Sequence, residues 1–384
     1  MKAAAALLVT VLLAGCAGST AGQAPAQSVM VQPGATTPDA TSPPPSSMPS
    51  SMPPSSAPMS MTPSPSAVAV VPGEPWILYQ WMAGGGDGLY LVRPDGTAGH
   101  RILADLPPQV YHPEWSPDGK VIAFALGQDN GEIWTANADG TDAKKLVGCD
   151  KAPCQWVDSV AWSPDGTKLA YVRFDDPAVK GKIGSRASIE VFDIATGKRR
   201  IVARPPADGT EHNEYILPRW SPDGRQLVFA MTHEPVPPTG PLLGSSIAVA
   251  SADGSEVDSV RNLTDPALFG GYPDWSPDGK HIVFTTYDQA YFEQGTQPAN
   301  LYTVGPDGTG LTQLTHFGEK DTRATQPTWT PDGKQIIFCH ITYDPTGKFG
   351  GWGVRHIAFV NADGTGLTVL DGQNATHPRL RPVP

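Results

Sequence analysis

The chain has 384 residues, among them 41 Gly and 41 Pro, and only 17% of its residues are charged. The formal net charge of −11 argues against nucleic acid or an anionic membrane surface as a partner, because both carry dense negative charge. Length alone allows more than one domain, so the internal organisation must come from the sequence pattern.

Residues 1–15 are expected to be a signal peptide. The apolar run from Ala3 to Leu13 follows a charged start and is too short to span a bilayer as a mature helix. It ends in Leu-Ala-Gly-Cys, which resembles a bacterial lipobox, where the peptide is cut before the Cys and the thiol carries the lipid. An ordinary secretory signal with an incidental Cys is the alternative. The sequence thus predicts an exported protein, lipid-anchored at Cys16 to the outer side of the cell membrane, in the periplasm or outer membrane if the cell has one.

Residues 16–73 are expected to form a disordered tether behind the lipidated Cys. The segment consists mainly of Pro, Ser, Ala, Thr and Met, with almost no charge and no aromatic residue, so it cannot form a core. Such a chain reaches roughly 40 Å as a coil and on the order of 170 Å when extended at ~3.1 Å per residue. This length would let the following domain stand clear of a wall or envelope layer.

A short phrase, Trp-Ser-Pro-Asp-Gly, recurs in the remainder of the chain. It occupies Trp115 to Gly119, Trp162 to Gly166, Trp220 to Gly224, Trp275 to Gly279 and, with Thr330 in place of Ser, Trp329 to Gly333. An apolar alternation that ends in an aromatic residue follows each copy. Pro fixes φ at the second turn position and Gly accepts the positive φ that closes the turn, so each phrase predicts a tight connection between antiparallel strands.

A second turn recurs out of phase with the first. It lies at Asp95-Gly96, Asp139-Gly140, Thr196-Gly197, Asp253-Gly254, Asp307-Gly308 and Asp363-Gly364, each between two short strand patterns. One repeat therefore contains four antiparallel strands, A to D, which is typical of one blade of a propeller. Six such turns predict an all-β fold, a six-bladed β-propeller over residues 74–384.

The two ends of this domain are expected to complete one blade. The first repeat lacks strand A and opens with strand B at Trp76. The segment Pro378 to Pro382 copies Pro218 to Pro222, with Leu380 in the place of Trp. We therefore expect the C-terminal strand to complete blade 1, which pairs strand edges that would otherwise be free.

Four cysteines are present, and Cys16 is assigned to the lipid. Cys149 and Cys154 bracket four residues in the connection between blades 2 and 3, and in an exported protein this spacing favours a disulfide. A zinc site there would need further ligands. Cys339 follows strand B of blade 6 and is expected to be a buried thiol.

All predicted tight turns lie at one end of the blades, the turn end, and the longer connections lie at the opposite loop end. Long loops on a rigid scaffold commonly carry binding, and aromatic and Arg side chains commonly anchor protein partners. The candidate binding residues are Tyr287, Tyr291, Phe292, His316, Asp321, Arg323, Tyr343, Phe349 and Trp352. The alternative is that these aromatic residues cover a small core of the loops themselves.

The innermost strands are expected to line a central channel. Three positions before each Trp, or before Leu380, stand His377, His112, Ser159, Leu217, Tyr272 and Gln326, in blade order. His112, His377 and Gln326 come from neighbouring blades and could bind a divalent metal, although the set has no carboxylate. The favoured interpretation is a polar, water-filled channel wall that includes Tyr272, with no metal and no cofactor.

The repeat W-S-P-D-G-K-x-I-A-F, followed by L-Y-x-x-x-x-D-G-T, resembles the propeller repeats of TolB and its relatives across residues 74–384. The resemblance implies binding of envelope proteins without catalysis. Related repeats occur in prolyl oligopeptidases and in a metal-dependent oligogalacturonate lyase. This chain differs from TolB in having a lipobox and tether where TolB has a small α/β domain, and it shows no hydrolase domain.

No catalytic motif accompanies the repeats: there is no nucleophile elbow, no His-Glu-x-x-His and no glycine-rich phosphate loop. The sequence therefore favours a monomeric, anchored module that binds envelope or surface proteins. A lyase or hydrolase that acts on glycans at the channel mouth, and a sensor of a small ligand, remain the alternatives.

Overall fold

The structure is a computed structural model, and it describes residues 73–383 except for 82–87, 108, 128–130, 152, 176–186, 206–211, 235–241, 288–297, 319–321, 343–352 and 371–373. The expected signal peptide, Cys16 and nearly all of the tether lie outside these residues. In the described part of the chain, no helix is long and apolar enough to cross a membrane.

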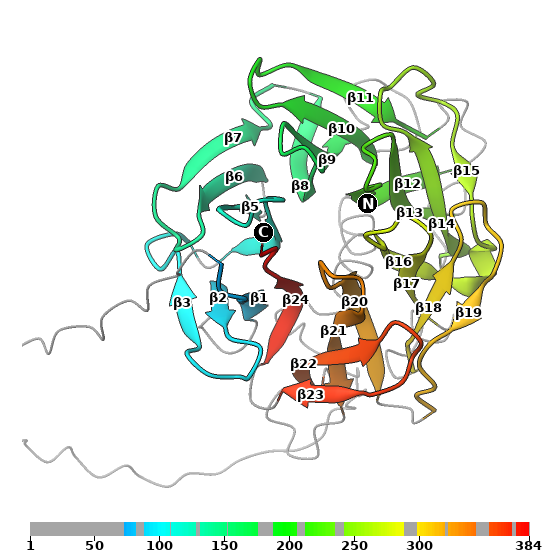
Figure 1. Cartoon of the computed structure of the whole chain (residues 1–384). Helices are drawn as coiled ribbons and strands as arrows, with labels where there is room; N and C mark the ends of the chain where they lie inside the picture. Colours follow the sequence, from blue (N-terminus) through cyan, green and yellow to red (C-terminus); the bar gives the residue numbers. More distant parts are fainter. Residues whose placement is uncertain are drawn as a thin grey trace, which may run out of the picture. The chain divides into compact units, whose positions relative to one another are not determined.

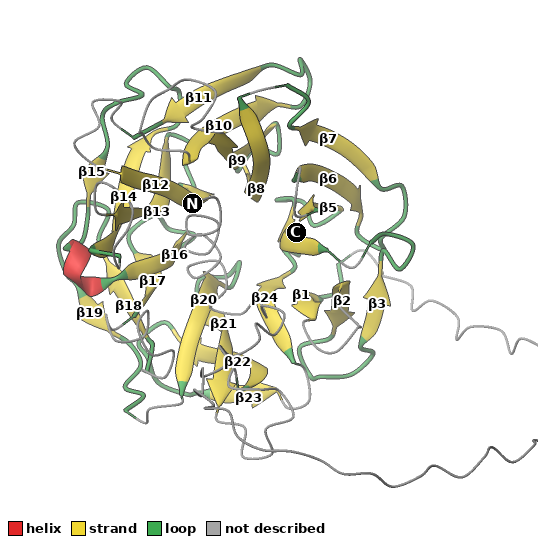
Figure 2. Ribbon diagram, turned by 180° about the vertical axis from the view of Figure 1, so that it is seen from behind, coloured by secondary structure: helices red, strands yellow, loops and turns green. Residues whose placement is uncertain are grey.

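The described strands form six four-stranded antiparallel sheets around a central axis, which confirms the predicted six-bladed β-propeller (Figures 1 and 2). From the axis to the rim, the blades are β24 (Ala375–Leu380), β1 (Ile77–Trp81), β2 (Gly88–Val92), β3 (His100–Ile102); β4 (Val110–Trp115), β5 (Val121–Leu126), β6 (Glu132–Asn137), β7 (Lys144–Gly148); β8 (Cys154–Trp162), β9 (Lys168–Asp175), β10 (Ala187–Asp193), β11 (Arg199–Ala203); β12 (His212–Trp220), β13 (Gln226–Glu234), β14 (Gly244–Ser251), β15 (Arg261–Asn262); β16 (Gly270–Trp275), β17 (Ile282–Thr286), β18 (Asn300–Val304), β19 (Thr312–Gln313); and β20 (Arg323–Trp329), β21 (Gln335–Thr342), β22 (Val354–Asn361), β23 (Thr368–Leu370). A short 3-10 helix, η2 (Pro266–Leu268), follows β15.

Hydrogen bonds within the Ser-Pro-Asp-Gly turn explain why the phrase recurs. In blade 3, Ser163 Oγ donates to Asp165 Oδ1 at 2.6 Å, and the Lys168 amide donates to Ser163 Oγ at 2.9 Å. Gly166 closes the turn with a φ of 69° and donates its amide to the Ser163 carbonyl. The other four copies repeat these bonds, and Thr330 substitutes for Ser because its hydroxyl donates to Asp332 in the same way. The phrase is thus a requirement of the fold.

The C-terminal strand closes the ring as predicted. β24 pairs with β1, with Leu380 opposite Ile77 and Ala375 opposite Trp81. Beyond β24, the Arg381 amide donates to the Trp76 carbonyl at 2.8 Å, and Arg381 Nε donates to the Gly119 carbonyl at 2.8 Å. The C-terminal segment therefore joins blade 1 to blade 2 as well as completing blade 1.

The core lies between the blades. The aromatic residue at the end of each strand B pattern is fully buried: Phe124, Tyr171, Phe229, Phe284 and Phe338. Phe124 of β5, for example, belongs to the same apolar cluster as Leu78 of β1, so the cluster joins blades 1 and 2. Burial of a large apolar side chain stabilises a fold by about 1.5–3 kcal/mol, so these contacts hold each blade against its neighbour.

The cysteines occupy two different environments. A disulfide joins Cys149, just after β7, to Cys154 at the start of β8, and it packs beside an apolar cluster that includes Val147 and Val157. It thus links the outermost strand of blade 2 to the innermost strand of blade 3. Cys339 is a fully buried thiol that takes no part in the disulfide.

Candidate functional site at the axis of the ring

Six residues of the innermost strands share an unusual backbone conformation. They are the residues three positions before each Trp, or before Leu380, and their φ values run from 48° to 58°: His112, Ser159, Leu217, Tyr272, Gln326 and His377. We call these six residues the left-handed ring. All are at most 5% exposed.

A β-bulge explains this conformation. In every blade, the pairing between strands A and B shifts register at this position, as between Tyr111 and Glu114 in blade 2. A Pro follows in five of the six blades and disfavours the right-handed helical conformation of the residue before it. Pro is tolerated here because strand A is the inner edge of its sheet. A left-handed non-Gly residue costs roughly 1–2 kcal/mol, and such strained positions tend to cluster at functional sites.

The left-handed ring brings together the histidines singled out from the sequence. The rings of His112 and His377 lie edge to face with centroids 4.5 Å apart, and Tyr272 lies 5.8 Å from His377. Gln326 holds His377 twice, because its Oε1 accepts the His377 amide at 2.9 Å and its Nε2 lies 3.1 Å from His377 Nε2. Burial, followed by the nearby His112, holds the pKa of His377 well below its usual value, so its ring is neutral.

His112 has a different partner, which the sequence did not suggest. Its Nδ1 lies 2.7 Å from Oδ1 of Asp158, the residue before Ser159 in blade 3. Nδ1 therefore carries the proton, and Nε2 is left as the lone-pair nitrogen when the ring is neutral. His112 Nε2 is buried and has no hydrogen-bond partner among the described residues. A carboxylate-oriented imidazole of this kind can accept a hydrogen bond or a proton from a ligand.

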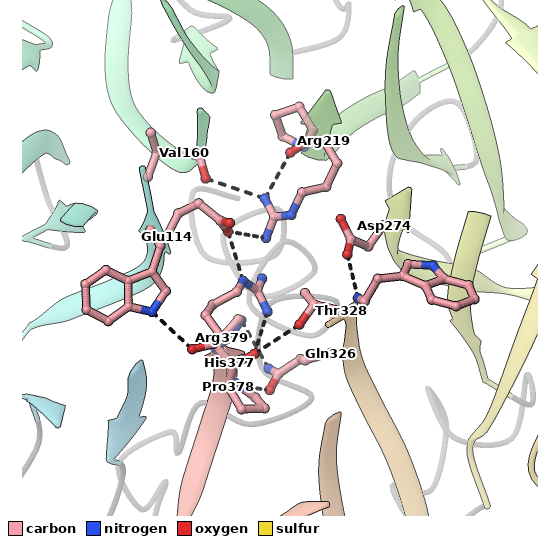
Figure 3. Close-up of polar contacts among 12 residues, drawn as sticks. Glu114, Val160, Arg219, Asp274, Gln326, Thr328, His377, Pro378 and Arg379 are labelled. Carbon is pink, nitrogen blue, oxygen red and sulfur yellow. Dashed lines mark hydrogen bonds and ion pairs between the residues drawn. The ribbon is translucent and has the colours of Figure 1, made fainter. Parts of the chain in front are cut away.

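A second set of axial side chains stands one position before each Trp or Leu380. We call it the pre-tryptophan ring, and it consists of Glu114, Ala161, Arg219, Asp274, Thr328 and Arg379. Glu114 Oε2 lies 2.9 Å from Arg379 Nε and 3.4 Å from Arg219 Nη2 (Figure 3). Since Arg219 and Glu114 come from blades 4 and 2, which are not adjacent, side chains span the centre at this level. These residues were not predicted from the sequence, although the repeated charge next to Trp could have indicated them.

Burial and hydrogen bonding tune the charges of this ring. Desolvation raises the pKa of Asp274 to about 6, although Arg219 and the Trp329 amide, which donates to Asp274 Oδ2 at 2.9 Å, both lower it. Burial lowers the pKa of Arg219, whereas Glu114 raises it. Arg219 also donates to the carbonyls of Pro218 and Val160, which fixes its direction (Figure 3). The carboxyl groups and the guanidinium groups of this ring can thus neutralise one another at the axis without a bound ion.

Metal binding was the alternative interpretation of the central histidines. Across the described segments, no group of three or more His, Cys, Asp or Glu side chains is arranged to hold a metal ion. The amide of Gln326 already occupies His377 Nε2. The described residues therefore do not fit the His/His/Gln metal site.

The expected loop-end residues divide into three groups. Tyr291, Phe292, Asp321, Tyr343, Phe349 and Trp352 lie outside the described residues. His316 is exposed, as expected. Tyr287 and Arg323 are instead 4% and 3% exposed. Tyr287 shares a hydrogen bond of 2.7 Å with Thr325 and Arg323 belongs to β20, so these two residues are part of the packed blades.

The fold and its axial site define a closed β-propeller with a charged, strained centre. Residues 153–351, more than half of the chain, match the TolB beta propeller domain, and the chain belongs to this family. It is 28% identical over 232 residues to the uncharacterized protein Atu1656 of Agrobacterium fabrum, which covers 60% of this chain and 69% of that protein. It is 35% identical over 72 residues to the Tol-Pal system protein TolB of Albidiferax ferrireducens, which covers 19% of this chain and 14% of that protein.

Two further comparisons show how widely this architecture is shared. The chain is 28% identical over 222 residues to the uncharacterized peptidase YuxL of Bacillus subtilis, but the match spans only 31% of YuxL and 51% of this chain. TolB from Acinetobacter baumannii superimposes with a TM-score of 0.55 at 16% identity, over 80% of this chain and 66% of that one. At this identity the likeness concerns the fold alone.

Proposed function

We propose that this chain is a cell-envelope-anchored, non-catalytic propeller that binds protein partners through its loop end. The observation that carries the proposal is the asymmetry of the ring. The five Ser-Pro-Asp-Gly turns and the second turns lie at one end of the blades, and local backbone hydrogen bonds close each Ser-Pro-Asp-Gly turn. The longer connections join the strands at the other end, where a rigid scaffold can present them to a partner. Membership of the TolB propeller family supports this assignment.

Anchoring at Cys16 can be tested by fractionation. Cys16→Ala is expected to move the protein from the membrane to the soluble or secreted fraction, because the tether has no apolar stretch that could replace a lipid. Cys339→Ala is the matched control and should stay in the membrane fraction, since Cys339 is a buried thiol of the propeller. Membrane association of Cys16→Ala that still requires detergent would contradict the anchor.

Partner binding at the loop end can be tested by crosslinking in intact cells, followed by pull-down from detergent-solubilised envelope. Tyr343→Ala with Trp352→Ala should abolish the crosslinked species that the wild type gives. Lys280→Ala with Lys334→Ala changes exposed side chains of the turn end and should leave that species intact. If the turn-end pair abolished the crosslinked species, or if neither pair did, the partner would bind elsewhere on the protein.

The pair of His112 and Asp158 favours a second candidate, an enzyme or small-ligand sensor that uses the axis. A carboxylate-oriented imidazole is a common general base. Metal analysis of the purified protein tests the metal-dependent form of this candidate. We expect substoichiometric metal in the wild type and in His112→Ala with His377→Ala, and a full equivalent that the double variant loses would favour the enzyme.

A further inference from the structure

Basic residues are distributed unevenly around the rim of the ring. The outermost strands of blades 1 to 4 begin with His100-Arg101, Lys144-Lys145, Arg199-Arg200 and Arg261-Asn262, whereas those of blades 5 and 6 begin with Thr312-Gln313 and Thr368-Val369. Residues 142–204 carry 12 Lys and Arg against 8 Asp and Glu, although the whole chain carries 27 against 38. This part of the chain, which includes inner strands as well as the rim, is therefore basic within an acidic protein.

Four cations of this part of the chain form no ion pair with a described residue, although Arg200 is close enough to Asp253 to help lower the pKa of that carboxyl. Lys145 is neutralised by Glu132 at 2.7 Å and by Asp150 at 3.4 Å. In contrast, no ion pair to a described residue forms at four exposed side chains, which we call the basic rim: Lys144, Lys198, Arg199 and Arg200. The charges of Lys144, Lys198 and Arg199 in particular are available to an external partner.

Backbone contacts fix two of these side chains at the surface. Arg199 donates to the carbonyl of Gly148 in blade 2 at 3.2 Å, and Arg200 donates to the carbonyl of Ala252 in blade 4 at 2.9 Å. The first contact places β11 beside the end of β7, in agreement with Figure 1. On the outermost strand of blade 3, Arg199 thus faces blade 2 and Arg200 faces blade 4.

Apolar side chains accompany these charges. Ile194 is 37% exposed and Ile201 is 38% exposed, and Ile201 follows Arg200 directly in β11. Exposed Ile beside unpaired cations is the composition of surfaces that bind at a membrane interface, where the cations meet phosphate and the apolar groups enter the headgroup region.

Charged side chains on an edge strand also prevent pairing with another chain. Edge protection would apply equally to all six rims. However, β19 and β23 have no Lys or Arg at all. The concentration of unpaired cations on blades 2 and 3 therefore needs a further explanation.

We infer that the basic rim docks on the phosphate headgroups of anionic phospholipids in the membrane that carries the protein. The choice of this membrane rests on the proposed lipid anchor, which would keep the propeller within reach of it. The net charge predicted no affinity for an anionic surface, but the local distribution of charge reverses that expectation for this part of the rim. Each Lys or Arg close to an anionic surface strengthens binding roughly fivefold at low ionic strength.

Vesicle sedimentation tests the docking without the lipid anchor. The full chain with Cys16→Ala is mixed with vesicles of phosphatidylglycerol and phosphatidylcholine, or of phosphatidylcholine alone. We expect binding to the anionic vesicles only, and a loss with added salt. Lys144→Gln with Lys198→Gln should weaken it roughly 25-fold, as two fivefold contributions multiply. Neither side chain makes a described hydrogen bond, so the thermal melting point should not change.

Lys280→Gln with Lys334→Gln is the matched control, because it removes the same charge from exposed side chains of blades 5 and 6. This control should change vesicle binding less than about twofold. An equal loss with both pairs, equal binding to phosphatidylcholine alone, or no binding at all would overturn the inference. These results would leave the anchor itself untouched, since fractionation of Cys16→Ala tests it separately.

Discussion

The glycine of the Ser-Pro-Asp-Gly turn serves two purposes that differ between blades. Gly166 and Gly119 both need Gly for their backbone conformation, with φ values of 69° and 64°. A Cβ at Gly166 would find its nearest neighbour, Pro117 Cδ, at an ordinary 3.9 Å. At Gly119, a Cβ would lie 2.5 Å from the Pro382 carbonyl oxygen. Only Gly119 is therefore also needed for the close approach of the C-terminal segment.

Gly119→Ala and Gly166→Ala separate these two requirements. Gly166→Ala should lower the free energy of unfolding by about 1 kcal/mol, the cost of a left-handed Ala. Gly119→Ala should cost about 2 kcal/mol more, because the closing segment must move. Urea denaturation of both variants measures the difference. Equal losses would show that the contact with Pro382 does not contribute to stability.

Individual residues of the axial site were predictable only where the repeat fixed their position. The spacing before each Trp placed His112, His377 and Gln326 in neighbouring blades, and the structure brings them into contact. The role of Asp158 was not predictable. Its contact with His112 depends on a β-bulge, and the residue types at this position do not predict the backbone conformation of the bulge. The ion pair of Glu114 with Arg219 was missed for a related reason, since it joins blades 2 and 4, which are not adjacent.

Among the elements, β24 determines whether the ring stays closed. It is the innermost strand of blade 1, it pairs with β1, and its Arg379 carbonyl accepts the indole N–H of Trp115 at 3.1 Å. Arg379 also joins Glu114 in the pre-tryptophan ring. Loss of β24 would therefore open a sheet edge and break the contacts of blades 1 and 2 together.

Deletion of residues 376–384 is expected to lower the melting temperature by at least about 10 °C, since several kcal/mol of packing and pairing would be lost. Deletion of residues 383–384 is the control, because it leaves β24 and Arg381 in place. Thermal denaturation followed by circular dichroism compares the two. If the longer deletion melted within about two degrees of the parent, closure by β24 would not support the ring.

The strand boundaries that could be predicted from the sequence were those set by turns with characteristic residues. Every Ser-Pro-Asp-Gly phrase marks the junction of strands A and B, because its hydrogen bonds are local. Tyr287 resembles an exposed loop residue in sequence but packs in a cluster with Phe269 and Tyr272, contacts that depend on the neighbouring strand of the same ring.

At the scale of the whole molecule, the turn aspartates link stability to pH. Hydrogen bonds from the hydroxyl and amide groups of their own turns lower the pKa of 11 aspartates, which are Asp118, Asp165, Asp223, Asp278, Asp332, Asp95, Asp139, Asp193, Asp253, Asp307 and Asp363. A carboxyl group whose pKa is lower in the folded state stabilises the fold above its unfolded pKa, and this stabilisation is lost as the pH falls through the folded pKa. Asp274 acts in the opposite direction, because burial raises its pKa to about 6.

The propeller should therefore lose stability mainly between pH 3.8, the ordinary Asp pKa, and about 2, the pKa to which the turn lowers that of Asp165. Asp165→Asn isolates one contribution to this loss. An amide cannot titrate, so the variant should melt below the wild type at pH 7, and the difference should shrink towards zero as the wild-type carboxyl takes up its proton near pH 2. Ser163→Ala removes the hydroxyl donor that contributes most to the low pKa, and its deficit should also be larger at pH 7 than at pH 2. Melting curves of the three proteins across this range measure the effect. A deficit for Asp165→Asn that stayed constant with pH would mean that the turn needs the shape of this side chain and gains nothing from its charge.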